Sequence, residues 1–204
     1  AVATLQSIGR SGVAMCAELG GIALVLWRTL KTIGAWRCDR LEFFRSLRSF
    51  GDGSLPIIAM TAVFTGCIML IQAAVYVRHF GVAHLVGWFT GFATVREVGP
   101  VLIGLVFSGR VGAGHTSELA AMAVTEQLVA LELLALDIYE ILIAPRALAM
   151  VVALLCLIMI GDAIAVFSGA VCAWFLIDID PRFFLHSLLD GLKVGDVLLG
   201  LSKG

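Results

Sequence analysis

Two opposite charges, Arg96 and Glu97, stand next to each other inside a long apolar stretch and are followed by Val98, Gly99 and Pro100. A charged side chain at the centre of a bilayer costs about 2.5–3.5 kcal/mol, so it has to face a protein interior or a wet cavity. Neighbouring residues of a helix point in different directions, which predicts different partners for the two charges. Because Pro100 has no N–H for the carbonyl four residues back, we expect a kink and a free carbonyl beside them.

The charged pair admits two interpretations. It could form a polar patch that borders a substrate cavity inside the membrane. It could instead join two helices through an ion pair, with Asp162 as the partner of Arg96. The residue types do not choose between these interpretations, and one pair could serve both purposes.

A possible lipid-facing stripe precedes the charges. Met69, Ala73, Tyr76 and Phe80 follow one another at spacings of four, three and four residues, as one face of a helix does. A flexible methionine with two aromatic rings could line a pocket for lipid. Ordinary helix packing is the alternative.

Small residues follow the charges at intervals of four: Gly104, Ser108 and Gly112. Such a face lets two membrane helices approach closely. A lipid-sized cavity is more easily enclosed by two copies of a small chain than by one, so we expect a homodimer.

Several motifs of enzymes and metal sites are absent. The sequence has no G-x-x-x-x-G-K-[ST] loop for ATP, no H-E-x-x-H and no G-x-S-x-G, so we expect neither an enzyme nor a bound cofactor. The histidines are scattered, which argues against metal; they are His79, His84, His115 and His186. The 5 cysteines lack C-x-x-C spacing and fit small packing residues better than a disulfide framework.

The composition of the chain indicates that membrane-spanning helices position these residues. Apolar residues make up 60% of the 204-residue chain and charged residues 14%, which is typical of an integral membrane protein. A formal net charge of −1 argues against nucleic acid as a partner. No basic-then-apolar signal peptide precedes the apolar runs, so insertion is expected to rely on the spans themselves.

Apolar runs predict transmembrane helices near 54–77, 85–109 and 147–177, with a further partial span at 194–204. The first run has no charge over its whole length, and the second contains the Arg96–Glu97 pair. The third has Asp162 as its only charge. At about 1.5 Å per residue it exceeds the bilayer, so it must tilt, protrude or break.

Residues 1–50 are predicted to contain an interfacial helix, and 51–204 the transmembrane bundle, all within one membrane domain. Six basic residues are interleaved with aromatic and apolar side chains before the first span: Arg28, Lys31, Arg37, Arg40, Arg45 and Arg48. A basic amphipathic segment of this kind lies in the cytoplasmic headgroup layer, and an ordinary soluble helix is the alternative.

The stretch 111–145 contains five carboxylates and no lysine or arginine. A segment of this charge is a poor candidate for crossing lipid, and its leucines recur at roughly helical spacing. We expect amphipathic helices on the cytoplasmic side, to which a hairpin of two spans returns the chain.

Four sequence blocks together resemble the MlaE/YrbE permeases of bacterial lipid ABC transporters. They are REVGPVL at 96–102, SGRVGAG at 108–114, SELAAMAVTEQLVALELLALD at 117–137 and PR at 145–146. The similarity is dense and covers roughly 54–177. It implies an all-α permease with an interfacial helix, four to five spans and a cytoplasmic coupling helix.

The resemblance also implies partners and site residues. In that family two permeases form a homodimer, separate ATP-hydrolysing subunits dock on the coupling helices, and an MCE-domain carrier exchanges phospholipid. The resemblance implies that Arg96 and Glu97 border the lipid cavity between the two protomers. The stripe of Met69, Tyr76 and Phe80 is assigned to this cavity from its residue pattern. The residues implied in ATPase docking are Glu118, Thr125, Glu126, Gln127 and Glu132.

The sequence departs from the family pattern at several positions. Alanine stands at 121 and 135 where glycine is common, Ala123 replaces a basic residue and Ile138 replaces proline. These changes make the docking segment more acidic and more helical. In DAIAVFSG at 162–169, two glycines of the family pattern are replaced by alanine and serine, and the family continues past residue 204 with a further span.

We therefore predict a multi-pass permease of the bacterial inner membrane that moves phospholipid or a related lipid, powered by a separate ATPase. One alternative is an ion- or proton-coupled secondary transporter using Arg96, Glu97 and Asp162, although no paired repeats support it. The other is a membrane anchor or assembly factor without a transport role.

Overall fold

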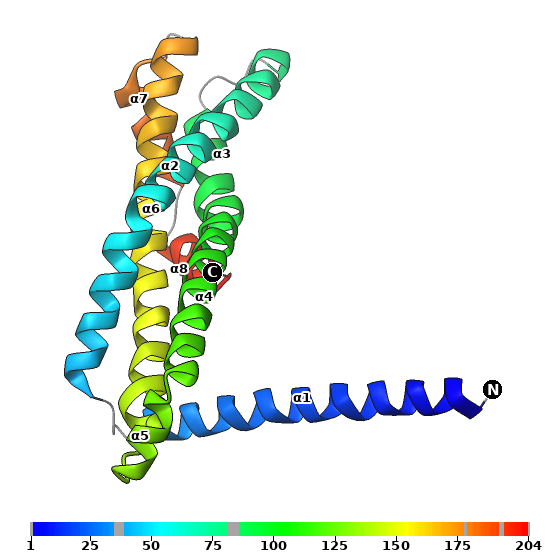
Figure 1. Cartoon of the computed structure of the whole chain (residues 1–204). Helices are drawn as coiled ribbons and strands as arrows, with labels where there is room; N and C mark the ends of the chain where they lie inside the picture. The colour runs from blue at the N-terminus through cyan, green and yellow to red at the C-terminus, as the bar shows by residue number, and fades with distance from the viewer. Residues whose placement is uncertain (1, 35–38, 81–85, 178, 192–193, 204) are drawn as a thin grey trace. The chain divides into compact units, whose positions relative to one another are not determined.

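The computed structural model describes residues 2–34, 39–80, 86–177, 179–191 and 194–203, and in these ranges it is helical without any strand (Figure 1). The long helices are α1 (Val2–Gly34), α2 (Arg40–Phe80), α4 (Gly99–Val124) and α6 (Ala144–Ile177). The short ones are α3 (Val86–Ala93), α5 (Gln127–Leu133), α7 (Pro181–Gly191) and α8 (Val194–Lys203). Two π-helical segments, η2 (Thr94–Val98) and η3 (Tyr139–Ile143), lead directly into α4 and α6.

Four stretches of helix are long and apolar enough to cross a membrane: Val13–Gly34, Arg40–Tyr76, Val86–Val124 and Tyr139–Leu176. The all-α membrane fold predicted from composition is confirmed. Val13–Gly34 meets the same criteria as the others, so the interfacial placement of the N-terminal helix stays a prediction.

One predicted span end is wrong, and the structure gives further detail for two other predicted segments. Three of the basic residues assigned to residues 1–50 begin the first long bundle helix, because α2 starts at Arg40 and continues through Gly51, Gly53 and Pro56. α4 runs to Val124, well past the end predicted at 109, since no helix-breaking proline follows Pro100 there. The further partial span predicted at 194–204 corresponds to α8, a ten-residue helix that packs on η2.

The described contacts fall into two compact units. The small unit comprises residues 1–46 and 122–149, and the large unit comprises 47–121 and 150–204. Each unit is described by itself below.

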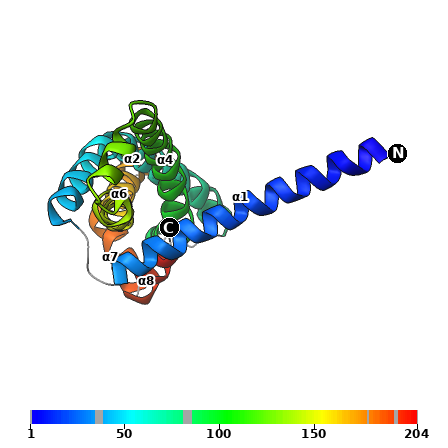
Figure 2. The same ribbon diagram turned by 60° about the horizontal axis from the view of Figure 1, so that its bottom comes forward.

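The core of the large unit forms where α2, α4 and α6 lie side by side, as two views agree (Figures 1 and 2). Ile58, Ile103, Phe107, Leu157 and Ile158 are at most 4% exposed and form one cluster. A second cluster joins α2, α3, α6 and α7; it includes Leu70, Val86, Ala173, Phe184 and Leu188. Lipid is as apolar as these side chains, so van der Waals packing holds such helices together.

α2 and α6 approach each other closely at Gly66. A Cβ at this position would overlap the carbonyl of Ala165 and the hydroxyl of Ser168. The Ser168 hydroxyl oxygen lies 3.1 Å from the Val63 carbonyl oxygen. Alanine and serine therefore form a close crossing where the family pattern has glycines, because the glycine of α2 supplies the space.

Candidate functional site

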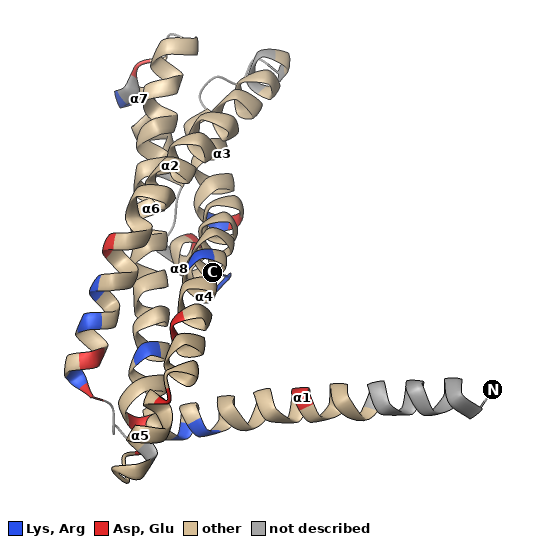
Figure 3. Cartoon of the chain, in the orientation of Figure 1, with Lys and Arg blue, Asp and Glu red and all other residues tan. Residues whose placement is uncertain are grey.

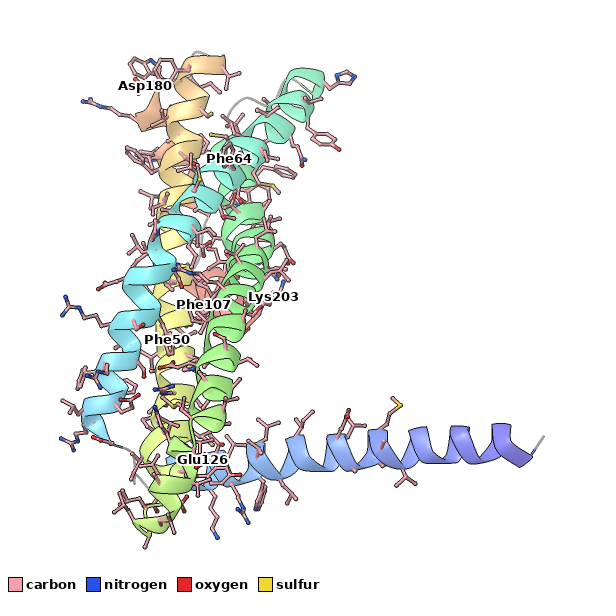
Figure 4. The ribbon with its side chains drawn as sticks, in the orientation of Figure 1. Phe50, Phe64, Phe107, Glu126, Asp180 and Lys203 are labelled. Atoms are coloured by element: carbon pink, nitrogen blue, oxygen red, sulfur yellow. The ribbon has the colours of Figure 1, made fainter. Side chains whose placement is uncertain are left out.

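The charges inside the second span are neutralised by α8. Nη1 of Arg96 lies 3.2 Å from Oδ1 of Asp196, and Nζ of Lys203 lies 2.6 Å from Oε1 of Glu97 (Figure 4). Arg96 Nε and Glu97 Oε1 are 4.0 Å apart, at the limit of an ion pair. The prediction of separate partners for Arg96 and Glu97 is confirmed. We call these four residues the charge quartet.

The π-helix η2 presents both charges of the pair to the same neighbour. The N–H of Gly99 donates to the carbonyl of Thr94, five residues back, which is the widened turn of a π-helix. The residue five positions after Val95 is Pro100, which has no N–H, so the Val95 carbonyl has no donor of this kind. The irregular backbone predicted at the proline thus takes the form of a π-helical turn.

A glycine allows α8 to reach this turn. Gly200 is buried, and a Cβ on it would collide with the Val95 carbonyl oxygen and meet the Pro100 ring at 3.2 Å. Asp196 and Lys203 stand four residues before and three after this glycine, so all three share one face of α8. Figure 3 shows the charged bands of α8 beside those of the second span.

Arg96 also contacts a pair of stacked aromatic rings. The guanidinium carbon lies 4.9 Å from the centre of the Phe92 ring, and Phe92 stacks on Trp88 with ring centres 5.5 Å apart. The three residues are spaced by four along α3 and η2. A cation over an aromatic face contributes about 0.5–1 kcal/mol where solvent reaches it.

The quartet is neutral in sum and only partly buried. The exposed fractions of the side chains are 34% for Arg96, 56% for Glu97, 14% for Asp196 and 38% for Lys203. Half-exposed charges at this depth require water or a polar ligand beside them.

Asp162 lies elsewhere. Its side chain, on α6, is 8% exposed, and Oδ1 packs against Gly99 without a hydrogen-bond partner among the described residues. Arg96 pairs with Asp196, so the proposed interhelical pair of Arg96 and Asp162 is wrong.

The predicted lipid-facing stripe on α2 is not uniform. Ala73 is fully buried, Met69 is half-buried and Tyr76 is 60% exposed, with its ring 6.4 Å from that of Phe89. The side chain of Phe80 lies outside the described residues. None of the described contacts joins Met69 or Tyr76 to the quartet, so their role at a lipid site stays a prediction.

The residues predicted to dock the ATPase are divided between the two units. Glu118 belongs to α4, in the large unit, and its Oε2 lies 3.8 Å from Nδ1 of His115. In the small unit, Thr125 and Glu126 form the turn between α4 and α5, and Gln127 begins α5 (Figure 4). Glu132 lies on α5, with a side chain outside the described residues.

Both ends of α5 are bounded by residues with left-handed backbone. Glu126 has a φ of 57° and Ala135 a φ of 55°, a region in which residues other than glycine are strained. Exposed apolar side chains gather around this helix: Val124 at 84%, Leu133 at 83% and Leu134 at 69%. The glycine that the family commonly has at 135 was the sequence signal for this turn.

The small unit also contains a buried ion pair that sequence reasoning missed. Nε of Arg146, at the start of α6, lies 2.9 Å from Oε1 of Glu42, at the start of α2, and the side chains are 10% and 15% exposed. Nearby contacts include the guanidinium of Arg28, 5.4 Å from the Tyr139 ring centre. The available signal was a carboxylate, Glu42, among the basic residues before the first span.

Comparisons with known proteins point to one family. The family model of permease MlaE matches residues 43–204. A probable ABC transporter permease protein of Rickettsia conorii is 32% identical over 198 residues, covering 97% of this chain and 76% of its own length. One from Rickettsia typhi is 36% identical over 196 residues, covering 96% and 76%. The intermembrane phospholipid transport system permease protein MlaE of Haemophilus influenzae is 33% identical over 166 residues, covering 81% and 64%.

Proposed function

Because the chain belongs to the MlaE permease family, we propose that it moves phospholipid or a related lipid between the bacterial inner membrane and an MCE-type carrier. Membership of this family makes it a multi-pass membrane permease of the ABC transporter type, and so a transporter rather than a catalytic enzyme. ATP would be hydrolysed by a separate subunit.

The charge quartet is the observation that carries the proposal. A phospholipid headgroup has a phosphate and often an ammonium group, and the quartet offers two cations and two carboxylates with exposed fractions up to 56%. The Lys203–Glu97 pair is the more exposed of the two pairs. A headgroup phosphate could replace Glu97 at Lys203, and the released carboxylate could then accept a headgroup ammonium.

ATPase docking is proposed at α5 and the turns on either side of it. Exposed leucines and a valine offer apolar contact, and the carboxylates of Glu126 and Asp137 stand at the two turns. A partner surface of apolar and basic residues would complement this segment. The strained turns would hold α5 in one orientation. A movement of the ATPase against α5 would then be transmitted to the end of α4 and the start of α6.

A homodimer is proposed through α4. Of the predicted stripe of Gly104, Ser108 and Gly112, Ser108 is exposed and Gly112 has nothing within 4 Å of the place where a Cβ would stand. This face is therefore free to meet a second helix closely. Recovery of the purified protein as a monomer both in mild detergent and in nanodiscs would contradict this part of the proposal.

Reconstituted lipid transfer tests the function. Vesicles containing the permease and its ATPase would be loaded with fluorescent phospholipid, and ATP-dependent transfer to an MCE-domain carrier would be measured. A photo-crosslinking residue at Met69 or Tyr76 should capture phospholipid in the same vesicles. Transfer that requires an ion gradient instead of ATP, or that persists without the ATPase, would overturn the proposal.

The double variant R96L/E97M tests the quartet separately. It also removes the cation beside Asp196 and the carboxylate beside Lys203, so membrane insertion and folding are measured together with transfer. The folded variant should lose lipid transfer. The matched control is R48L/D52L, which removes an exposed i,i+4 pair on α2, 3.3 Å apart, and should leave transfer intact. Normal lipid transfer by R96L/E97M would show that the quartet is not part of the lipid site.

A further inference from the structure

Two thiols meet between neighbouring helices of the large unit. Cys67 on α2 and Cys172 on α6 are separated by 105 residues in the sequence, and their Sγ atoms lie 3.0 Å apart. Both side chains are half-buried, so a small reagent can reach them. The other two described cysteines, Cys16 and Cys156, are exposed and have no sulfur partner among the described residues.

The thiol contact follows the register of the close α2–α6 crossing at Gly66. One helical turn earlier, the Ser168 hydroxyl contacts the Val63 carbonyl oxygen. Cys172 and Cys67 lie four residues after Ser168 and Val63, respectively. Gly66 lies against α6 between these two contacts, with no room for a Cβ. Backbone packing therefore holds the thiols together, and a shift of one helix along the other would separate them.

We infer that Cys67 and Cys172 form a redox-active pair whose oxidation to a disulfide locks α2 to α6. A disulfide has an S–S distance of about 2.05 Å, so closing the bond requires the sulfurs to move by about 1 Å. Rotation about the side-chain torsions of the two cysteines can provide a movement of this size. Helix packing already supplies the larger part of the alignment.

The reaction is a thiol–disulfide exchange with an oxidant that itself carries a disulfide. One cysteine, as its thiolate, attacks a sulfur of the oxidant, forms a mixed disulfide and releases one thiol of the reagent. The second cysteine attacks the protein sulfur of this mixed disulfide, forms the Sγ–Sγ bond and releases the second thiol. Two protein thiols are oxidised, and one reagent disulfide is reduced to two thiols.

The pair can be tested in the full-length protein in nanodiscs. A variant with C16S, C38S and C156S retains the pair, and two matched controls also have C67S or C172S. Each is treated with dithiodipyridine, an apolar disulfide, and its intact mass and cross-linked peptides are measured. The pair variant should lose two hydrogens and carry no adduct, with Cys67 linked to Cys172, whereas each control should carry one adduct. Two adducts on the pair variant, or no reaction, would overturn the inference.

The effect on transport rests on the proposed function and is measured separately. Oxidation of the pair variant should abolish ATP-dependent lipid transfer, and a phosphine reductant should restore it, because the lock stops α2 from sliding on α6. The C67S control should be unaffected by these steps. Unchanged transfer by cross-linked protein would overturn the lock. Absent transfer in the reduced protein as well would count against the proposed function, while the mass measurement still decides the thiol pair.

Discussion

Two groups of ion pairs in this chain differ in exposure and, we argue, in purpose. Glu42 and Arg146 in the small unit are 15% and 10% exposed and hold the starts of two long helices together. In the charge quartet of the large unit, Glu97 is 56% exposed and Lys203 38%. Removing one partner of a buried pair is costly because the other charge stays buried, whereas a half-exposed pair can exchange partners with a ligand. Burial thus distinguishes the Glu42–Arg146 pair from the Lys203–Glu97 pair, which is exposed enough to bind a ligand. The Arg96–Asp196 pair, 34% and 14% exposed, lies between these two.

The largest effect is expected from breaking the buried pair. R146L leaves the Glu42 carboxylate buried without its cation, which should lower the free energy of unfolding by about 3–5 kcal/mol. Chemical unfolding in detergent micelles measures this change. The double variant E42M/R146L should lose much less stability, since no charge is left alone. Equal losses in the two variants would show that the pair does not act as a buried charge pair.

The next largest change in stability is expected from disturbing the packing of α8 on η2. G200A places a Cβ against the Val95 carbonyl, so α8 has to shift, and overpacking of this kind costs about 1–3 kcal/mol. G195A is the matched control on the same helix, because nothing lies within 4 Å of its added Cβ. Thermal unfolding should distinguish the two variants. If both are equally stable, the quartet does not depend on close contact at Gly200.

A smaller effect, of opposite sign, is expected at the end of the turn after α5. A135G removes a Cβ from a residue with a φ of 55° and should stabilise the protein by about 1 kcal/mol, because left-handed backbone is strained for alanine. A121G tests the other alanine that replaces a family glycine. It lies inside α4, so it should instead destabilise by about 0.5–1 kcal/mol. The same sign for both variants would contradict this assignment.

The smallest change in stability should accompany the largest change in binding. K203M removes the exposed cation of the quartet, which should alter the free energy of unfolding by less than about 1 kcal/mol. It should nevertheless abolish ATP-dependent phospholipid transfer if Lys203 receives the headgroup phosphate. K31M, which removes an exposed lysine from α1, is the control for both measurements. Strong destabilisation by K203M, or unchanged lipid transfer, would contradict the claim that Lys203 serves binding rather than the stability of the fold.

The sequence predicted the site only in part. It identified Arg96 and Glu97 because charge within an apolar run is unusual, and Pro100 because its missing N–H disturbs any helix. It did not identify Asp196 and Lys203, since a short segment with two charges reads as an ordinary amphipathic helix. The Glu42–Arg146 pair was missed for a similar reason: each residue alone resembles a normal interfacial charge.

The amino-acid sequence by itself determined the membrane class, the helical elements and the position of the intramembrane charges. These follow from local properties: hydropathy over about 20 residues, helical periodicity and the chemistry of proline. Only the tertiary structure decided which side chains the charged residues and the cysteines contact. Arg96 meets Asp196 across 100 residues, and Cys67 meets Cys172 across 105. Such contacts depend on helix register and on the space left by Gly66 and Gly200, which arise only when the helices pack together.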